Sequence, residues 1–336
     1  MSPQRLNNIV VVGGGTGTHT VLSGLKKHVD GPKPLSLSAI ITVADSGGST
    51  GRLRDEFGRL PVGDFRVALS ALADSDNGEN LLRDLFLYRF EKGQGLSGHN
   101  FGNLFLVALS DLLGSEEKAI AFASKMLRVR GSVIPVADTP LSLKARYEDG
   151  TERVGETHID EPPEGHDGTL RITALSVEPD VEISERARDA IRRADAIILG
   201  PGGLYTSVLP NIVVRGMREA LSETPAKIVT VVNLMSWYGQ THGLSGTDHT
   251  DELARYAGRE PDYILVNSAP LPESITAAYA AQNEFPVPDN FGTDRRVIRD
   301  DLLASEEIKK TGGDVLKRSL IRHDPDKLAR AILSLL

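Results

Sequence analysis

Cysteine is absent from this chain of 336 residues. Without thiols the chain cannot form a disulfide scaffold, a thiolate zinc site or an iron–sulfur cluster held by thiolates, and it cannot use a cysteine nucleophile. A protein without disulfides suits a reducing compartment. We therefore expect a cytoplasmic protein.

Long apolar runs are also absent. The runs at residues 9–12 and 196–199 contain four residues each, far fewer than the ~20 that a bilayer-spanning helix needs. Residues 1–8 lack the apolar stretch of a secretory signal. These features predict a soluble protein with no membrane partner.

Basic residues are the minority among the charged ones. Lys and Arg total 38 against 46 Asp and Glu, which gives a net charge of −8. Proteins that bind nucleic acid without sequence preference need a basic face, so we expect no nucleic-acid partner. Apolar residues make up 40% of the chain, which is enough to bury a sizeable core.

The chain repeats a pattern of short apolar strand, glycine-rich turn and helix. Strands are predicted at residues 8–12, 38–44, 195–199, 227–232 and 262–266, and helices at 18–28, through most of 65–127, and at 325–335. Short, continuously apolar strands separated by helices predict an α/β fold, a Rossmann-like parallel sheet with helices on both faces. Ligands of such sheets bind outside the carboxyl ends of the strands.

Residues 136–180 differ from this pattern. Residues 141–147 alternate apolar and polar side chains, and 151–159 and 169–177 are further candidate strands. The alternation predicts a small antiparallel β insertion. We expect residues 1–336 to form a single α/β domain that carries this insertion.

The first loop, residues 13–18, is rich in glycine and lies between a strand and a helix. Glycines let the backbone approach a phosphate, and a helix N-terminus offers exposed N–H groups. The loop is not a P-loop, and Thr18 stands where a dinucleotide-binding motif has its third glycine. A tight turn without a ligand is the alternative. The candidate ligand-binding residues here are Gly14, Gly15, Thr16 and Gly17.

The second loop, residues 42–54, carries more chemistry. After Asp45 it combines three glycines and three hydroxyl side chains with two arginines, whose guanidinium groups suit phosphate. We favour an anion site over a solvated surface loop. The candidate ligand-binding residues here are Ser46, Gly47, Gly48, Ser49 and Arg52.

Two shorter segments add candidate polar groups. Asp64 precedes an apolar run, where it either caps a helix or shares a Mg²⁺ ion with Asp45. His99 and Asn103 are four residues apart and would share one face of a helix. His99 is a candidate for phosphate binding or acid–base chemistry, and a structural histidine is the alternative.

Two later strands also end in polar loops, at residues 200–207 and 233–243. The ligand-binding candidates in these loops are Gly200, Gly202, Gly203, Tyr205, Thr206 and Asn233. Because the carboxyl ends of parallel strands share one edge of a sheet, we predict that all these loops form one crevice for a long, phosphate-rich ligand.

Taken together, the loops resemble the YvcK/CofD-like family. Blocks in matching order and spacing lie at residues 13–17, 42–54, 61–66, 85–90, 98–103 and 200–207. The sequence is more similar to the YvcK branch, the gluconeogenesis factors, which bind UDP-sugars and affect cell shape and growth on gluconeogenic carbon sources. The CofD branch is the Mg²⁺-dependent 2-phospho-L-lactate transferase of coenzyme F420 biosynthesis.

The resemblance implies roles for four positions. Asp45 and Asp64 match the acidic residues that hold the metal in the transferase branch, so Mg²⁺ is the candidate cofactor. Tyr279 and Arg322 match the residues that serve UDP-sugar binding in the YvcK branch. Read without the resemblance, Tyr279 is a helix residue at the edge of the core and Arg322 is a surface charge.

Three positions depart from the family pattern. Ser46 replaces the second aspartate of the second loop, Val67 replaces an asparagine, and Gln240 replaces an acidic residue. The first change weakens a two-carboxylate metal site within that loop. Each departure removes a carboxylate or an amide that the family pattern has at that position.

Three functions compete. We favour a regulatory protein that binds a UDP-sugar or another phosphorylated nucleotide without turnover. Because members of the family often form dimers, we expect a homodimer. The second candidate is a Mg²⁺-dependent transferase with catalytic candidates Asp45, Asp64 and His99. The third candidate is an NAD-dependent oxidoreductase in which Asp45 binds the ribose. The missing third glycine of the dinucleotide-binding motif argues against it.

Overall fold

A computed structural model describes residues 7–74, 81–305 and 320–336 of the chain. Its centre is a seven-stranded sheet in the order β10-β9-β8-β7-β1-β2-β3, with every neighbouring pair parallel. The strands are β1 (Asn7–Gly13), β2 (Leu35–Ile41), β3 (Ser132–Pro135), β7 (Ala196–Leu199), β8 (Lys227–Val231), β9 (Tyr263–Asn267) and β10 (Val297–Asp300). The predicted α/β class and parallel sheet are confirmed.

The strand order reverses beside β1. From β1 the chain adds β2 and β3 on one side, and from β7 it adds β8, β9 and β10 on the other. This reversal creates a topological switch point between β1 and β7, where open α/β sheets bind their ligands. The first loop and the loop after Leu199 both lie at that point.

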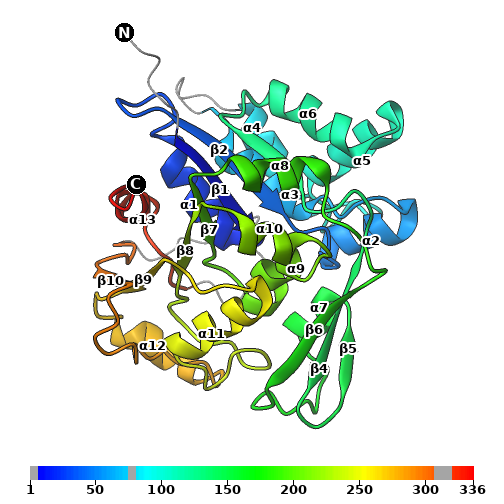
Figure 1. Cartoon of the computed structure of the whole chain (residues 1–336). Helices are drawn as coiled ribbons and strands as arrows, with labels where there is room; N and C mark the ends of the chain where they lie inside the picture. The colour runs from blue at the N-terminus through cyan, green and yellow to red at the C-terminus, as the bar shows by residue number, and fades with distance from the viewer. Residues whose placement is uncertain (1–6, 75–80, 306–319) are drawn as a thin grey trace.

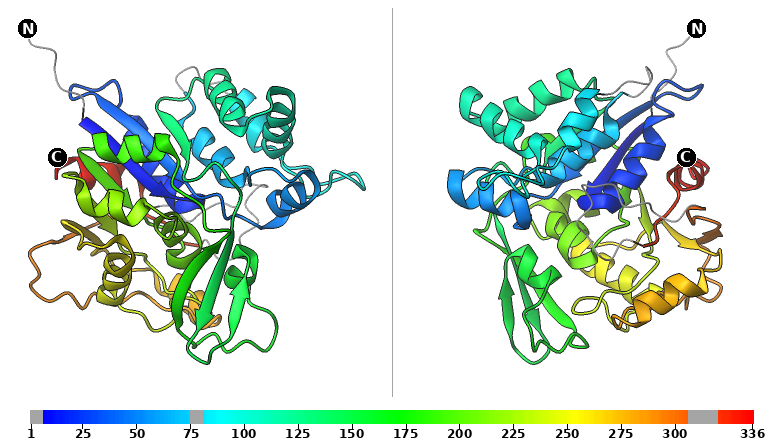
Figure 2. Two further views of the ribbon diagram at one scale, coloured as in Figure 1. Left: turned by 45° about the vertical axis from the view of Figure 1, so that its right-hand side comes forward. Right: turned by 180° about the vertical axis from the view of Figure 1, so that it is seen from behind.

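Helices cover both faces of the sheet (Figure 2). One layer contains α1 (Gly15–Lys26), α3 (Gly63–Leu72) and α13 (Pro325–Leu333), with α1 packed between the other two. The other layer contains α8 (Glu185–Arg193), α9 (Leu209–Ile212) and α10 (Met217–Glu223). Sequence reasoning missed β3 and β10, because both are four-residue strands at the sheet edges and β10 is half polar.

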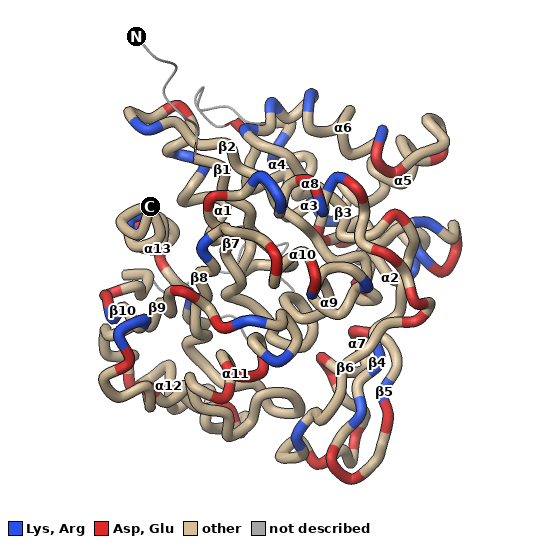
Figure 3. The backbone as a smooth tube through the Cα atoms, viewed as in Figure 1, with Lys and Arg blue, Asp and Glu red and all other residues tan. Residues whose placement is uncertain are grey.

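The remaining helices lie around this core. They are α2 (Gly48–Phe57), α4 (Leu81–Leu87), α5 (Phe101–Leu113), α6 (Glu116–Met126), α11 (Gly246–Ala257) and α12 (Glu273–Ala280). In the view of Figure 3, Lys and Arg are interspersed with Asp and Glu over the chain, so charge alone does not single out a binding face. Among the described residues, none of the helices combines the length and apolar character that crossing a membrane requires.

The antiparallel insertion is present and projects from the main body (Figure 1). It contains β4 (Ser142–Tyr147), β5 (Glu152–Val154) and β6 (Ile172–Glu178) in the order β5-β4-β6. The predicted strand over 151–159 is wrong beyond Val154. Gly155, at φ 95°, turns the chain into the short helix α7 (Glu156–Asp160). That turn directs acidic side chains toward the sheet.

Candidate functional site

A cavity of about 290 Å³ lies at the switch point, outside the carboxyl ends of the strands. Gly14 after β1, Asp45 after β2, Gly202 after β7 and Asn233 after β8 all line it. The prediction that the loops form one crevice is therefore confirmed. The predicted site residues that line this cavity are Gly14, Gly15, Thr16, Gly17, Asp45, Asp64, Gly202, Gly203, Thr206, Asn233, Tyr279 and Arg322.

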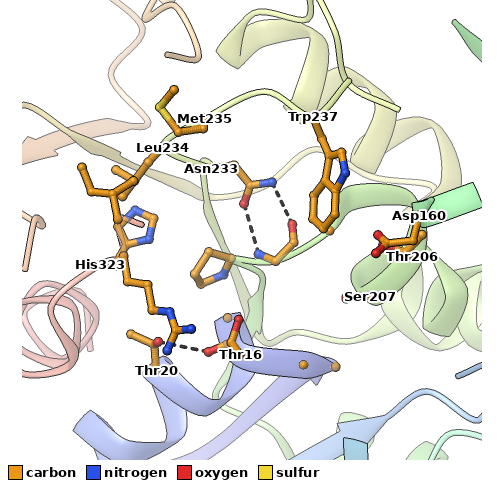
Figure 4. A pocket seen from close by; sticks show the side chains of 18 of the residues that line it. Thr16, Thr20, Asp160, Thr206, Ser207, Asn233, Leu234, Met235, Trp237 and His323 are labelled. Carbon is orange, nitrogen blue, oxygen red and sulfur yellow. Dashed lines mark hydrogen bonds between the residues drawn. The ribbon is translucent and has the colours of Figure 1, made fainter. Parts of the chain in front are cut away.

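The first loop and the loop after β7 are packed directly against each other. A Cβ at Gly17 would overlap the carbonyl oxygen of Pro201, so only glycine fits there. Asn233 fixes the second of these loops, because its Oδ1 accepts from Gly202 N at 3.1 Å and its Nδ2 donates to Gly202 O at 2.7 Å (Figure 4). The N-terminal turn of α1, with N–H groups that have no intrahelical acceptor, borders the cavity and suits an anion.

Four carboxylates form an acidic wall of the same cavity: Asp45, Asp64, Glu156 and Asp160. Burial and the charge of Asp45 raise the pKa of Asp64 to about 7. Burial, followed by the neighbouring carboxylates, raises the pKa of Glu156 well above its ordinary value. Burial and the nearby carboxylates thus favour the protonated forms of Asp64 and Glu156, so a cation or a hydroxyl-bearing ligand group would be a matching partner.

Sequence reasoning missed Glu156 and Asp160 because it assigned a strand through residue 159. Their spacing of four residues is the signal that could have found them, since on a helix such residues share one face. Asp64 was predicted either to cap α3 or to hold a metal. The prediction that Asp64 caps α3 is wrong, because Val62 occupies the N-cap position. The Oδ1 of Asp64 instead accepts a hydrogen bond from Gly15 N at 2.9 Å.

The C-terminal wall consists of Tyr279, Glu284, Ile321, Arg322 and His323. Tyr279 of α12 is buried and its Oη accepts from Leu320 N at 3.2 Å, which ties the helix to the segment that carries Arg322. Tyr279 is thus a core-edge residue and a cavity-lining residue at once. His19 has a pKa lowered to about 4, first by burial and then by Arg83 and Arg322, so Arg322 lies near α1.

His99 and Asn103 do not share a helix face as predicted. The helix α5 begins at Phe101 with Asn100 as its N-cap, so His99 precedes it. Both side chains instead meet at Ser49: His99 Nδ1 lies 3.1 Å from Ser49 Oγ, and Asn103 Nδ2 donates to that oxygen at 3.2 Å. This buried cluster joins α2 to α5.

Several predicted ligand-binding residues lie outside the wall of this cavity. Ser49 and Arg52 do so because they belong to α2, which begins at Gly48 and carries these side chains toward α5 and the segment before it. Arg52 lies in α2 and donates to Ser97 O at 3.2 Å. Tyr205 donates to Glu252 Oε1 at 3.2 Å. The predicted residues that do not line the cavity are Ser46, Gly47, Gly48, Ser49, Arg52, His99, Asn103, Gly200 and Tyr205.

Within residues 7–74, 81–305 and 320–336, no group of three or more histidine or acidic side chains is arranged to hold a metal ion. The pair of Asp45 and Asp64 remains the predicted metal site, with both residues half-buried and close enough for the charge of one to shift the pKa of the other.

Comparisons with known proteins agree on one family. Residues 9–303 match the family model described as 2-phospho-L-lactate transferase CofD. The chain is 41% identical over 333 residues to a "Putative gluconeogenesis factor" of Aquifex aeolicus, covering 98% of this chain and 96% of the relative. It is 39% identical to the "Gluconeogenesis factor" of Bacillus subtilis, covering 98% of each chain.

The fold also matches a solved structure. A crystal structure of a Bacillus halodurans protein superposes with a TM-score of 0.86 at 37% identity, covering 98% of this chain and 100% of that chain. At this identity and coverage, the likeness extends to both the parallel sheet and the antiparallel insertion.

Proposed function

Since this chain belongs to the CofD family, we propose that it is a regulatory UDP-sugar-binding protein of the gluconeogenesis factor type. The observation that carries the proposal is the convergence of three elements on one cavity: the N-terminal turn of α1, Tyr279 and Arg322. A helix N-terminus and a guanidinium suit a diphosphate, and an aromatic ring suits a base or sugar.

The proposal describes binding without turnover. Gln240 in place of the family's usual acid donates through Nε2 to Asp160 Oδ1 at 3.1 Å, so the substituted amide anchors part of the acidic wall. Its further parts come from the sequence. The family resemblance implies an effect on carbon metabolism and cell shape and a homodimer. The absence of cysteine and of a secretory signal favours a cytoplasmic location, and the strand–helix pattern favours a single domain over residues 1–336.

Calorimetric titration with UDP-N-acetylglucosamine and UDP-glucose tests the proposal. Tyr279→Ala and Arg322→Ala should each raise the dissociation constant at least ~10-fold, since a stacked base and a phosphate contact are each worth about 1–3 kcal/mol. Tyr279→Phe is the matched control: it removes the hydroxyl that accepts from Leu320 N but keeps the ring. Unchanged UDP-sugar affinity in both alanine variants would make us abandon the proposal.

One observation favours a second candidate, a Mg²⁺-dependent enzyme similar to 2-phospho-L-lactate transferase. Asp45 and Asp64 lie half-buried beside each other at the cavity, and Mg²⁺ in proteins is commonly held by one or two carboxylates together with substrate phosphates. The two residues therefore fit the ion, which would supply charge to neutralise a phosphate group. This candidate predicts that Asp45→Asn and Asp64→Asn abolish turnover while Tyr279→Ala is nearly neutral, the reverse of the order expected for a binder.

A further inference from the structure

His323 presents an unusual side chain to the cavity. It lines the wall, is only 5% exposed, and its Nε2 has no hydrogen-bond partner among the residues that the structure describes. Buried polar atoms in folded proteins nearly always have a partner, and an exception in the wall of a binding cavity points to a group on the ligand.

The backbone around His323 is held firmly. His323 forms an antiparallel bridge with Leu303, and the residues on both sides of it add bonds to the same segment. Ala304 N donates to Arg322 O at 3.1 Å, and Asp324 N donates to Leu302 O at 2.8 Å. Asp324 in turn is the N-cap of α13. A ring carried by such a frame is already oriented before a ligand arrives, which reduces the entropy lost on binding.

The surroundings of His323 suit an uncharged partner. Burial lowers the pKa of its imidazole to about 4, and among the described residues no charged group contributes to that shift. The ring is therefore neutral at physiological pH, with one nitrogen that donates and one that accepts. A phosphate would favour a cation, so a neutral hydrogen-bonding group is the better match for this part of the cavity.

The position of His323 indicates which part of a nucleotide lies beside it. In Figure 4, His323 lies with Leu234 and Met235 on one side of the pocket, and Asp160 and Thr206 lie on the opposite side. Thr16, at the N-terminal turn of α1, lies between these two sides. A ligand with its phosphates at α1 would thus extend one end toward His323 and the other toward Asp160 of the acidic wall.

We propose that His323 recognises the nucleobase of the bound nucleotide by a hydrogen bond to its uncharged imidazole, while the group beyond the phosphates faces the acidic wall. With its proton on Nε2, the neutral ring would donate to a carbonyl oxygen of the uracil edge, and cytosine presents a donating amino group in place of that oxygen. The inference rests on the proposed function, and it adds the direction in which the ligand lies and a residue that selects the base.

The test compares UDP-glucose with CDP-glucose by calorimetric titration. The two ligands differ only at the base edge, where cytosine exchanges a carbonyl and an N–H of uracil for an amino group and a bare ring nitrogen. For His323→Leu we expect UDP-glucose affinity to fall about 10-fold and the preference between the two ligands to collapse, because a buried hydrogen bond is lost. His323→Gln, which keeps a neutral donor and acceptor, should retain most of the preference.

His249 provides a matched control. It is also buried, its Nδ1 lies 2.9 Å from Ser245 O, its Nε2 lacks a partner among the described residues, and it lies outside this cavity. His249→Leu should therefore bind both ligands like the wild type.

Equal UDP-glucose affinity in the wild type and His323→Leu would overturn the inference and leave the proposed function standing. If His323→Leu lost the same affinity for UDP-glucose and CDP-glucose, the inference would also be overturned, because the imidazole would then contact the ribose or the phosphates and not the base. Failure of the wild type to bind UDP-glucose would overturn the proposed function and the inference together.

Discussion

The first loop, residues 13–18, and the second loop, residues 42–54, both follow buried strands and both are rich in glycine, but they meet the cavity very differently. The first loop contributes Gly14, Gly15, Thr16 and Gly17 to its wall, whereas the second contributes only Asp45. In sequence the second loop looks the better phosphate site, because it has more hydroxyls and two arginines.

The difference arises from where each helix begins. The helix α1 begins at Gly15, so its first turn lies at the switch point beside the loop after β7. The helix α2 begins at Gly48, and from there Ser49 bonds to His99 and Asn103 while Arg52 bonds to Ser97 O. Most of the polar side chains of the second loop are therefore used to attach α2 to its neighbours.

The largest expected effect is in the first loop. Gly17→Ala should lower the free energy of unfolding by ~3 kcal/mol, because its Cβ would overlap Pro201 O and two backbone segments must separate. Gly48→Ala is the second-loop counterpart: at φ 44° with no atom within 4 Å of the added Cβ, it should cost only ~1 kcal/mol through backbone strain. Urea denaturation measures both, and equal losses would contradict the difference in packing between the loops.

The next effect concerns Asp64. Its carboxylate accepts a hydrogen bond from Gly15 of the first loop, and the charge of Asp45 in the second loop disfavours its ionised form. Its folded pKa of about 7 lies above the ordinary 3.8, so the folded protein binds the proton more tightly than the unfolded chain. Stability should therefore fall as pH rises from about 4 to 7, by up to ~1.4 kcal/mol per pH unit for one proton. Asp64→Asn, which keeps an oxygen for Gly15 N, should reduce that slope; parallel pH–stability curves would show that Asp64 does not titrate in this window.

The smallest expected effect lies in the second loop. Ser49→Ala should cost ~1 kcal/mol of unfolding free energy, because His99 and Asn103 lose a buried partner, and it should leave UDP-sugar affinity unchanged. Arg52→Ala, at an exposed position, should change stability by less than ~0.5 kcal/mol and also leave affinity unchanged. A large loss of UDP-sugar affinity in Arg52→Ala would restore the phosphate role that its sequence motif predicts.

The sequence predicted the core of the fold well, because buried parallel strands leave a direct signature. Five continuously apolar runs correspond to β1, β2, β7, β8 and β9. The edge strands β3 and β10 were missed because each is short and β10 is half exposed, so neither has an uninterrupted apolar run. The turn at Gly155 was missed because the strand predicted over 151–159 ran across the glycine at which the chain turns into α7.

The sequence by itself determined the fold class, the family and the presence of strand-end loops, because these depend on local periodicity and on motifs read along the chain. Only the tertiary structure decided which motif side chains reach the cavity. It brought Glu156 from the insertion and His323 from the C-terminal segment to the same cavity as Gly14, although Glu156 lies 142 positions and His323 lies 309 positions after Gly14 in sequence. Such convergence depends on the strand order and on the direction in which each helix leaves the sheet, and neither is encoded in any one segment of the chain.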